Sequence, residues 1–160
     1  MNETSVLSGA PRVETAGPLN IAGLNERYNH TTRVNIPAQW QRFAPYIGAV
    51  PGQVDGVAYG VCWSGSASGE FNYLTGVEVA GASNLPAGFE CLTIPAQRYA
   101  VFTHRGHIAG LPESIQSVWT KALPASGYQA VQSPFIERYD SRFDAQTGMG
   151  EVELWVAIHD

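Results

Sequence analysis

Two stretches of the chain place apolar side chains at helical spacing behind a proline. The first starts at Pro37 and has apolar residues at positions 40, 43, 44 and 47, and the second starts at Pro112 and has them at 115, 118, 119 and 122. Both follow the i, i+3, i+4, i+7 stripe of an amphipathic helix, and proline is tolerated in a first helical turn. The pattern predicts two matching helices that begin about 75 residues apart.

Segments in which apolar and polar residues alternate surround each helix and are typical of β-strands. One strand is expected before each helix, and after it a β-hairpin of two strands joined by a glycine-rich turn. The predicted strands cover residues 13–24, 56–63 and 71–79 in the first half of the chain and 92–104, 134–139 and 151–158 in the second. The order β-α-β-β therefore occurs twice.

This order predicts an α+β fold of tandem duplicated β-α-β-β modules, with antiparallel sheets and one helix per module. We expect residues 1–10 to be a flexible N-terminus and 11–160 to form a single domain, with repeats at about 11–83 and 84–160. One helix covers only one face of its module's sheet, so the two modules would pack together. A ligand cleft is expected between them, because small-molecule sites favour such junctions.

The last predicted strand sorts its side chains onto two faces. Its aliphatic residues, at positions 152, 154, 156 and 158, are expected to face the helix, which places Glu153 and Trp155 on the opposite face. In the preceding strand the alternation is ambiguous. If Ile136 packs on the helix, Glu137 and Tyr139 join Glu153 and Trp155, and two carboxylates then share one face of the sheet with aromatic rings.

In the first module the same alternation places Tyr59 and Trp63 on one side of their strand and Tyr73 on one side of the next, without settling which side faces the helix. Carboxylates beside aromatic rings suit a cationic, partly hydrophobic ligand. The rings supply apolar area and cation–π attraction, and a desolvated glutamate supplies the counter-charge. The alternative is a solvent-exposed face whose glutamates only increase solubility.

The composition narrows the functional classes. The 160 residues carry a formal net charge of -5 and include nine Lys and Arg, so the sequence lacks the basic footprint expected for direct nucleic-acid binding. The two cysteines form no CxxC motif, and His104 and His107 have no third ligand at metal spacing, so neither a metal site nor a cofactor is indicated. No apolar run approaches the roughly 20 residues of a membrane span. The N-terminus lacks the features of a secretory signal, so a cytoplasmic location is expected.

Several short motifs follow one another in a specific order. In the second half they are residues 94–106 (IPAQRYAVFTHRG), Trp119, 123–128 (LPASGY), 134–139 (PFIERY) and 152–156 (VELWV), and the first half adds 36–40 (IPAQW) and 73–79 (YLTGVEV). Together they resemble the GyrI-like effector-binding domain, a bacterial domain found after AraC-type and MerR-type DNA-binding regions and also as stand-alone proteins. The resemblance extends from about Pro11 to Ile158.

The resemblance implies a tandem fold around a central cleft that takes hydrophobic, often cationic, compounds. The pocket glutamate of the family's Pro-x-x-Glu-x-Tyr strand corresponds to Glu137, and the triplet of its last strand corresponds to Glu153, Leu154 and Trp155. Arg138 departs from the family, in which an aliphatic residue is usual at this position. The sequence also contains no helix-turn-helix region before the fold.

Our first hypothesis is a stand-alone effector-binding protein, similar to the ligand-binding domains of AraC- and MerR-type transcription activators, that binds a cationic or aromatic hydrophobic compound. Glu137 would be the main charge partner and Glu153 the second. The aromatic lining would comprise Tyr59, Trp63, Tyr73, Tyr139 and Trp155.

Two alternatives follow from the same resemblance. One is a GyrI-like hydrolase that opens cyclopropane rings in DNA-alkylating compounds, with Glu137 and Glu153 as a carboxylate pair that supplies a general acid and orients water. The other is an interaction module that resembles a DNA gyrase inhibitor. The first alternative uses the same residues as the binding hypothesis, so the sequence does not separate the two. It specifies neither a protein partner nor a homodimer.

Overall fold

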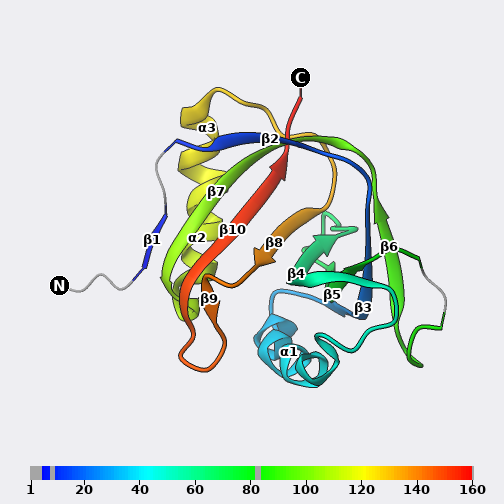
Figure 1. Ribbon diagram of the computed structural model, residues 1–160. Helices are drawn as coiled ribbons and strands as arrows, with labels where there is room; N and C mark the ends of the chain where they lie inside the picture. The colour runs from blue at the N-terminus through cyan, green and yellow to red at the C-terminus, as the bar shows by residue number, and fades with distance from the viewer. Residues whose placement is uncertain (1–4, 8–9, 82–83, 160) are drawn as a thin grey trace.

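One curled antiparallel sheet runs through the molecule (Figure 1). The computed structural model describes residues 5–7, 10–81 and 84–159. Its strands are β1 (Ser5–Leu7), β2 (Arg12–Ala16), β3 (Leu19–Tyr28), β4 (Gln53–Trp63), β5 (Phe71–Val79), β6 (Glu90–Ile94), β7 (Gln97–His107), β8 (Phe135–Tyr139), β9 (Phe143–Asp144) and β10 (Met149–Ala157). They join in the order β1-β7-β10-β8-β4-β5-β3-β6, with β2 also paired to β7 and β9 to β10. The sheet and its helices confirm the α+β class.

Two of the expected strands are each divided in two at a proline. The segment expected over 13–24 forms β2 and β3 on either side of Pro18, and the segment expected over 92–104 forms β6 and β7 on either side of Pro95. Proline has no N–H to donate to a neighbouring strand, so the pairing is interrupted there. The neighbouring strand also changes at each break. β2 pairs with β7, whereas β3 pairs with β5 and β6.

The start of the chain contributes a strand that the sequence did not predict. Ser5–Leu7, part of the segment expected to be flexible, forms β1 and pairs with residues 104–106 of β7. It extends the edge of the sheet beyond β2, where the backbone of β7 offers further hydrogen-bonding groups. The remainder of that expectation, at residues 1–4 and 8–9, lies outside the described residues, as do residues 82–83 at the expected repeat boundary.

The two predicted helices are present. Helix α1 (Ile36–Phe43) and helix α2 (Leu111–Ser117) both carry their proline in the first turn. The second helical segment is longer than expected, because a π-helical turn over residues 118–122 leads from α2 into α3 (Leu123–Ser126). Gly127 ends it with a φ of 82°, a left-handed conformation that glycine adopts without a Cβ clash. None of the helices in the described ranges is long and apolar enough to cross a membrane.

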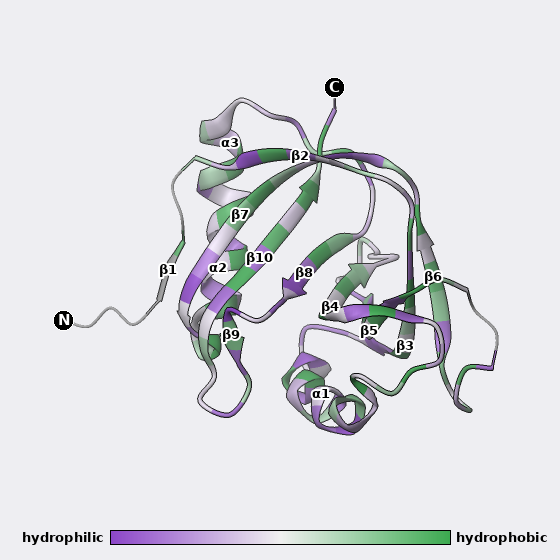
Figure 2. Cartoon of the chain, in the orientation of Figure 1, coloured by the Kyte–Doolittle hydropathy of each residue, from purple (hydrophilic) through white to green (hydrophobic). Residues whose placement is uncertain are grey.

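Buried side chains pack on both faces of the sheet. On the helix face, one cluster joins α2 and α3 to β7, β8 and β10, and a second joins α1 to β3 and β5. A third cluster fills the opposite face, called here the inner face, and draws residues from strands β3 to β8 and from β10. Figure 2 shows hydrophobic stretches along β7, β8 and β10. The cluster against α2 contains Val152, Leu154, Val156 and Ile158, which confirms the predicted orientation of the last strand.

Candidate functional site

The pairing of β8 with β10 places the two candidate glutamates on opposite faces of the sheet. Leu154 lies opposite Glu137, and Glu153 lies opposite Arg138. Directly paired residues of antiparallel strands point to the same face. Leu154 packs against the helices, so Glu137 faces the helices while Glu153 faces inward. The expectation of a shared face is therefore wrong, because Ile136 packs in the inner-face cluster rather than on a helix.

Glu137 is held in a cluster of three aromatic side chains from α1, β5 and β8. Its side chain is buried, with 5% of the residue exposed, and Oε1 accepts hydrogen bonds from the hydroxyls of Tyr73 at 2.7 Å and Tyr139 at 2.9 Å. The indole Nε1 of Trp40 donates to the Tyr73 hydroxyl at 2.9 Å. The Trp40 ring also meets Tyr139 edge-to-face, with 5.1 Å between centroids. The three rings and the carboxylate form one connected group.

Helix α1 is fixed over this group by a buried glutamine. The Nε2 of Gln39 donates to the carbonyl oxygens of Leu24 at 2.8 Å and Tyr73 at 2.9 Å. Its Oε1 accepts from the Tyr28 hydroxyl at 2.6 Å. Because Gln39 is fully buried, each of these bonds replaces a contact with water that the amide cannot make. The adjacent Trp40 is consequently held against β5 and β8.

Gly60 on β4 provides the space for the carboxylate and the phenol. It lies opposite Glu137 in the pairing of β4 with β8. A Cβ at this position would lie 2.2 Å from the Tyr73 hydroxyl oxygen and 2.7 Å from Oε1 of Glu137. Both distances are well below van der Waals contact, so the Tyr73–Glu137 hydrogen bond requires a residue without a side chain at position 60.

The electrostatics of this cluster favour a neutral phenol pair around one carboxyl group. Burial raises the pKa of Glu137, and the hydrogen bonds from Tyr73 and Tyr139 oppose part of that rise. Burial and then the charge of Glu137 raise the pKa of both tyrosines well above their usual value, so both remain donors. Among the described residues, no ion pair joins Glu137 to a Lys, Arg or His side chain.

Glu153 has the opposite environment. It is also buried, with 3% of the residue exposed, but Oε2 accepts from Arg142 at 2.8 Å and from Arg12 at 3.0 Å. Its Oε1 accepts from the indole Nε1 of Trp155 at 3.0 Å and lies 3.7 Å from the guanidinium of Arg138. Burial alone would raise the pKa of Glu153, but the hydrogen bonds from Arg142, Trp155 and Arg12 outweigh it and the pKa is lowered. This carboxylate is already neutralised by the protein.

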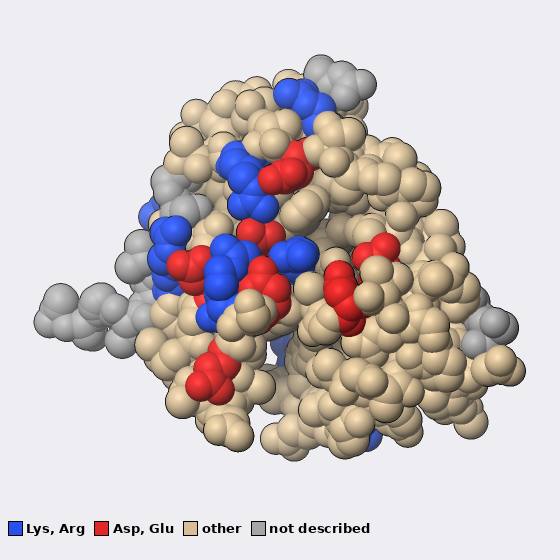
Figure 3. All heavy atoms as spheres, viewed as in Figure 1, with Lys and Arg blue, Asp and Glu red and all other residues tan. Residues whose placement is uncertain are grey.

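Arg138, the residue that departs from the family pattern, belongs to this charged network. It pairs with Asp140 at 2.9 Å, and Arg142 pairs with both Asp140 at 2.8 Å and Glu151 at 3.1 Å. Hydrogen bonds from Arg142 lower the pKa of Asp140 to about 2. Figure 3 shows acidic and basic side chains gathered together on this face of the molecule. The network therefore contains alternating charges rather than a patch of one sign.

A small apolar pocket lies beside the network on the inner face. Its volume is about 60 Å³. Trp155 forms one wall and meets Tyr99 edge-to-face, with 5.1 Å between ring centroids. Trp63 packs at the edge of the same cluster and donates its indole N–H to Oδ1 of Asn25 at 3.1 Å. The pocket is lined by Ala16, Leu19, Tyr59, Ile136 and Trp155.

The structure thus divides the seven predicted site residues into two groups. One group, on the helix face, consists of Glu137, Tyr73 and Tyr139. The other, on the inner face, consists of Glu153, Trp155, Tyr59 and Trp63.

The predicted site did not include several residues that contact these two groups, among them Trp40, Gly60, Arg12 and Arg142. Trp40 was assigned to the apolar stripe of its helix and to the IPAQW motif, although an indole can also donate a hydrogen bond. The other three approach the glutamates through strand pairing or a turn.

Comparison with known proteins identifies relatives of this fold. The family model described as the GyrI-like small molecule binding domain matches residues 9–159. The transcriptional regulator BrlR of Pseudomonas aeruginosa is 34% identical over 122 residues, which cover 75% of this chain. The match covers 45% of BrlR, so the chain spans less than half the length of that relative.

Two solved structures share the fold. The structure of SAV2435 bound to tetraphenylphosphonium has a TM-score of 0.76 and 19% sequence identity, and the match covers 93% of each chain. The integron cassette protein VCH_CASS2, from the mobile metagenome of Vibrio cholerae, has a TM-score of 0.67 and 17% identity over 98% of this chain and 100% of its own. At these identities the two structures establish similarity of fold.

Proposed function

The chain belongs to the family of GyrI-like small-molecule binding domains, and we propose that it is an effector-binding protein whose Glu137 receives a hydrophobic cation. The observation that carries the proposal is the environment of this carboxyl group. Glu137 is buried, and the partners that its side chain has are two phenol hydroxyls rather than a cation. A buried carboxyl group without a counter-charge is costly when ionised. A ligand cation can provide that missing charge.

The contrast with Glu153 supports this choice between the two glutamates. Two arginines donate to Glu153 directly and a third lies within 3.7 Å. A ligand cation at that position would have to compete with guanidinium groups that are permanently charged. At Glu137 it would compete only with hydrogen bonds from Tyr73 and Tyr139, and it would gain their rings and that of Trp40 as aromatic walls.

The ligand in the SAV2435 structure agrees with this chemistry. Tetraphenylphosphonium, to which SAV2435 is bound, is a permanent cation whose phosphorus atom carries four phenyl rings. Such a ligand lacks hydrogen-bond donors and acceptors, so its binding depends on apolar area, on cation–π attraction and on a counter-charge. Those are the three contributions that Trp40, Tyr73, Tyr139 and Glu137 can make together.

Access to Glu137 requires a rearrangement of its cover. The carboxyl group is buried, and Trp40 lies against both tyrosines. A ligand that contacts the carboxylate must therefore displace the Trp40 ring or one of the two phenols. Each hydrogen bond that the ligand breaks in this way opposes binding by about 0.5–1.5 kcal/mol.

The two-repeat arrangement, with repeats at about 11–83 and 84–160, remains part of the proposal. Helices α1 and α2 begin at Ile36 and Leu111, close to the spacing of about 75 residues expected from the sequence. The apolar pocket of the inner face draws Ala16, Leu19 and Tyr59 from the first half of the chain and Ile136 and Trp155 from the second. Both features support a ligand cleft between duplicated modules.

The hydrolase alternative loses its main support. It requires two carboxyl groups that face one substrate, and Glu137 and Glu153 project from opposite faces of the sheet. No feature of the described residues favours the gyrase-inhibitor alternative. A cytoplasmic location remains part of the binding proposal.

Isothermal titration calorimetry with two ions of the same shape tests the proposal. Tetraphenylphosphonium is a cation and tetraphenylborate is an anion, and both carry four phenyl rings. We expect the wild-type protein to bind the cation and to bind the anion far more weakly. Glu137→Gln keeps the size of the side chain and removes its charge, so the affinity for the cation should fall by more than about tenfold.

Two further variants make the result decisive. Glu26→Gln, which removes an exposed carboxylate paired with Arg42, should bind the cation as the wild type does. Glu153→Gln separates the two faces of the sheet. If the affinity falls in Glu153→Gln and not in Glu137→Gln, the cation binds on the inner face and the assignment of Glu137 is wrong. Equal affinities for the cation and the anion would refute a charge-selective site altogether.

A further inference from the structure

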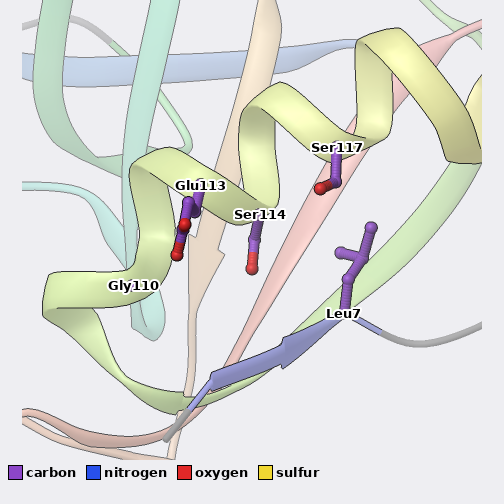
Figure 4. A pocket seen from close by; sticks show the side chains of 5 residues that line it. All are labelled: Leu7, Gly110, Glu113, Ser114 and Ser117. Carbon is purple, nitrogen blue, oxygen red and sulfur yellow. The ribbon is translucent and has the colours of Figure 1, made fainter. Parts of the chain in front are cut away.

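A second pocket, which neither Glu137 nor Glu153 lines, opens between β1 and α2. Its volume is about 160 Å³, and it is lined by Leu7, Gly110, Glu113, Ser114 and Ser117. A cavity of about 150 Å³ is large enough to hold a molecule the size of benzene. Figure 4 shows the side chains of Glu113 and Ser114 on α2 and that of Leu7 on β1 around this space. Glu113 is exposed, so the pocket reaches the surface.

A buried serine and a buried histidine are hydrogen-bonded beside this pocket. The Oγ of Ser114 lies 2.6 Å from Nδ1 of His104, and the Nε2 of His104 lies 3.0 Å from the backbone carbonyl oxygen of His107. Ser114 is 5% exposed and His104 is fully buried. His104 comes from β7 and Ser114 from α2, so the sheet and the helix together fix their separation.

The two contacts of His104 determine which nitrogen carries its proton. A carbonyl oxygen can only accept, so the Nε2 that faces the His107 carbonyl must be the protonated nitrogen. In a neutral ring Nδ1 then has a free lone pair, and the Ser114 hydroxyl donates to it. Burial lowers the pKa of His104, which keeps the ring neutral near physiological pH. Ser114 is therefore hydrogen-bonded to a base in its proton-accepting form.

We propose that Ser114 is an activated nucleophile that accepts the acyl group of a small, uncharged ester, with His104 as its general base. A serine hydroxyl is a weak nucleophile until an adjacent base removes its proton, and the 2.6 Å between Oγ of Ser114 and Nδ1 of His104 is within reach of that proton transfer. The pocket at Ser114 provides the space for the acyl group.

The reaction balances with water as the only other reactant. As the Ser114 oxygen forms a bond to the ester carbonyl carbon, its proton passes to Nδ1 of His104. The bond to the leaving alkoxide then breaks, and the alkoxide takes that proton and departs as the alcohol. In the second half a water molecule attacks the carbonyl carbon of the acyl-serine and gives a proton to Nδ1 of His104. The bond between that carbon and the Ser114 oxygen then breaks, His104 returns the proton to the oxygen, and the carboxylic acid and free Ser114 are released.

The pocket restricts the class of ester. Its volume of about 160 Å³ suits a short acyl chain or a single ring rather than a lipid. The exposed carboxylate of Glu113 lies at the opening and repels an anionic substrate. Small neutral esters are therefore the expected substrates. This inference does not depend on the cation site, because no residue is shared between the two.

A fluorophosphonate probe tests the proposal on the whole protein. Such a probe forms a covalent bond with a serine oxygen that a neighbouring base has activated, and peptide mass spectrometry identifies the serine. We expect the adduct on Ser114 in the folded wild-type protein, in large excess over the exposed Ser66 and Ser68 of the same chain. Hydrolysis of p-nitrophenyl acetate should accompany it. No adduct on Ser114, or labelling equal to that of the exposed serines, overturns the proposal.

Three variants identify the cause of the labelling. Ser114→Ala should abolish both the adduct and the ester hydrolysis. His104→Gln should slow labelling at Ser114 by about 10²-fold or more, the usual contribution of a general base. Ser126→Ala is the matched control, since Ser126 lies in the same helical segment and donates only to the Leu123 carbonyl.

The melting temperature shows whether each variant is folded. Labelling that is unchanged in a folded His104→Gln also overturns the proposal. If that variant does not fold, the comparison of Ser114 with Ser66 and Ser68 in the wild-type protein still decides the outcome.

Discussion

Replacing Gly60 with alanine should destabilise the protein through the cluster around Glu137. The backbone of Gly60 does not require a positive φ, so alanine can adopt its conformation. The added Cβ would, however, lie 2.2 Å from the Tyr73 hydroxyl oxygen and 2.9 Å from the ring carbon that carries it. Tyr73 is only 2% exposed and is hydrogen-bonded to Trp40 and Glu137, so its ring has little room to move.

Three contributions set the magnitude. Forcing an extra methyl group into a packed site costs about 1–3 kcal/mol. Loss of the Tyr73–Glu137 hydrogen bond costs about 0.5–1.5 kcal/mol. Against these, alanine restricts the unfolded chain and returns about 0.4–1 kcal/mol. The free energy of unfolding should therefore fall by about 2 kcal/mol. With a slope of about 2 kcal/mol per molar urea, the unfolding midpoint would move down by about 1 M.

Urea unfolding of paired variants measures this effect and identifies its source. Gly56→Ala on the same strand is the control, because a Cβ there meets nothing within 4 Å and should leave the midpoint unchanged or slightly raised. In a Tyr73→Phe background the nearest contact is gone, so Gly60→Ala should cost at least about 1 kcal/mol less. A Gly60→Ala midpoint equal to that of Gly56→Ala would refute the close approach of Tyr73 and Glu137.

Three more predictions concern stability and can be measured by urea unfolding. The raised pKa of Glu137 means that the native state binds the extra proton, so the contribution of this group to stability should fall as the pH rises from about 4.3 through the native pKa, and Glu137→Gln should remove that contribution. The lowered pKa of Glu153 has the opposite effect: the contribution of this group to stability is present above about pH 4.3 and is lost as the pH falls through the native pKa. Glu153→Gln should lower the free energy of unfolding by about 1–2 kcal/mol at pH 7 and make it less sensitive to acid. Gln39→Leu should cost about 2–3 kcal/mol, because the carbonyl oxygens of Leu24 and Tyr73 lose their buried donor. A pH dependence of stability that is the same in Glu137→Gln as in the wild type, or a neutral Gln39→Leu, would contradict the corresponding contact.

Local signals were sufficient for most of the secondary structure. Proline in a first turn followed by an apolar stripe located α1 and α2, and alternation located β5 at its observed bounds of Phe71–Val79. Two strands were predicted too long, because each is interrupted at a proline, Pro18 or Pro95. A proline is a local signal too, but the strand with which the chain pairs after it depends on the tertiary structure.

The alternation of residues in β8 could not show which of its side chains face the helices. Phe135 and Ile136 are adjacent and both apolar, so either choice of face buries one of them. Only the pairing with β10 and β4 decides that Ile136 and Arg138 face inward and Glu137 faces the helices. Both predicted glutamates are therefore buried, but they lie on opposite faces of the sheet and cannot belong to one site.

The missed partners of the glutamates are distant in the chain. Arg12 is 141 residues from Glu153, and Gly60 reaches Glu137 only through the pairing of β4 with β8. One sequence carries no signal for contacts of that range, because alternation specifies which side a residue faces and not which strand lies beside it. The fold class follows from local pattern, whereas the site depends on register.

The divided strands make the two halves of the chain incomplete without each other. β2 belongs to the first half in sequence but pairs with β7, and β6 belongs to the second half but pairs with β3. A cut between β5 and β6 would therefore leave two fragments that each expose an unfinished sheet edge and half of the shared inner core. Such fragments should reassemble when mixed rather than fold alone. The intact chain should unfold as one cooperative unit, so amide hydrogens in the core strands of both halves should exchange with the same limiting free energy.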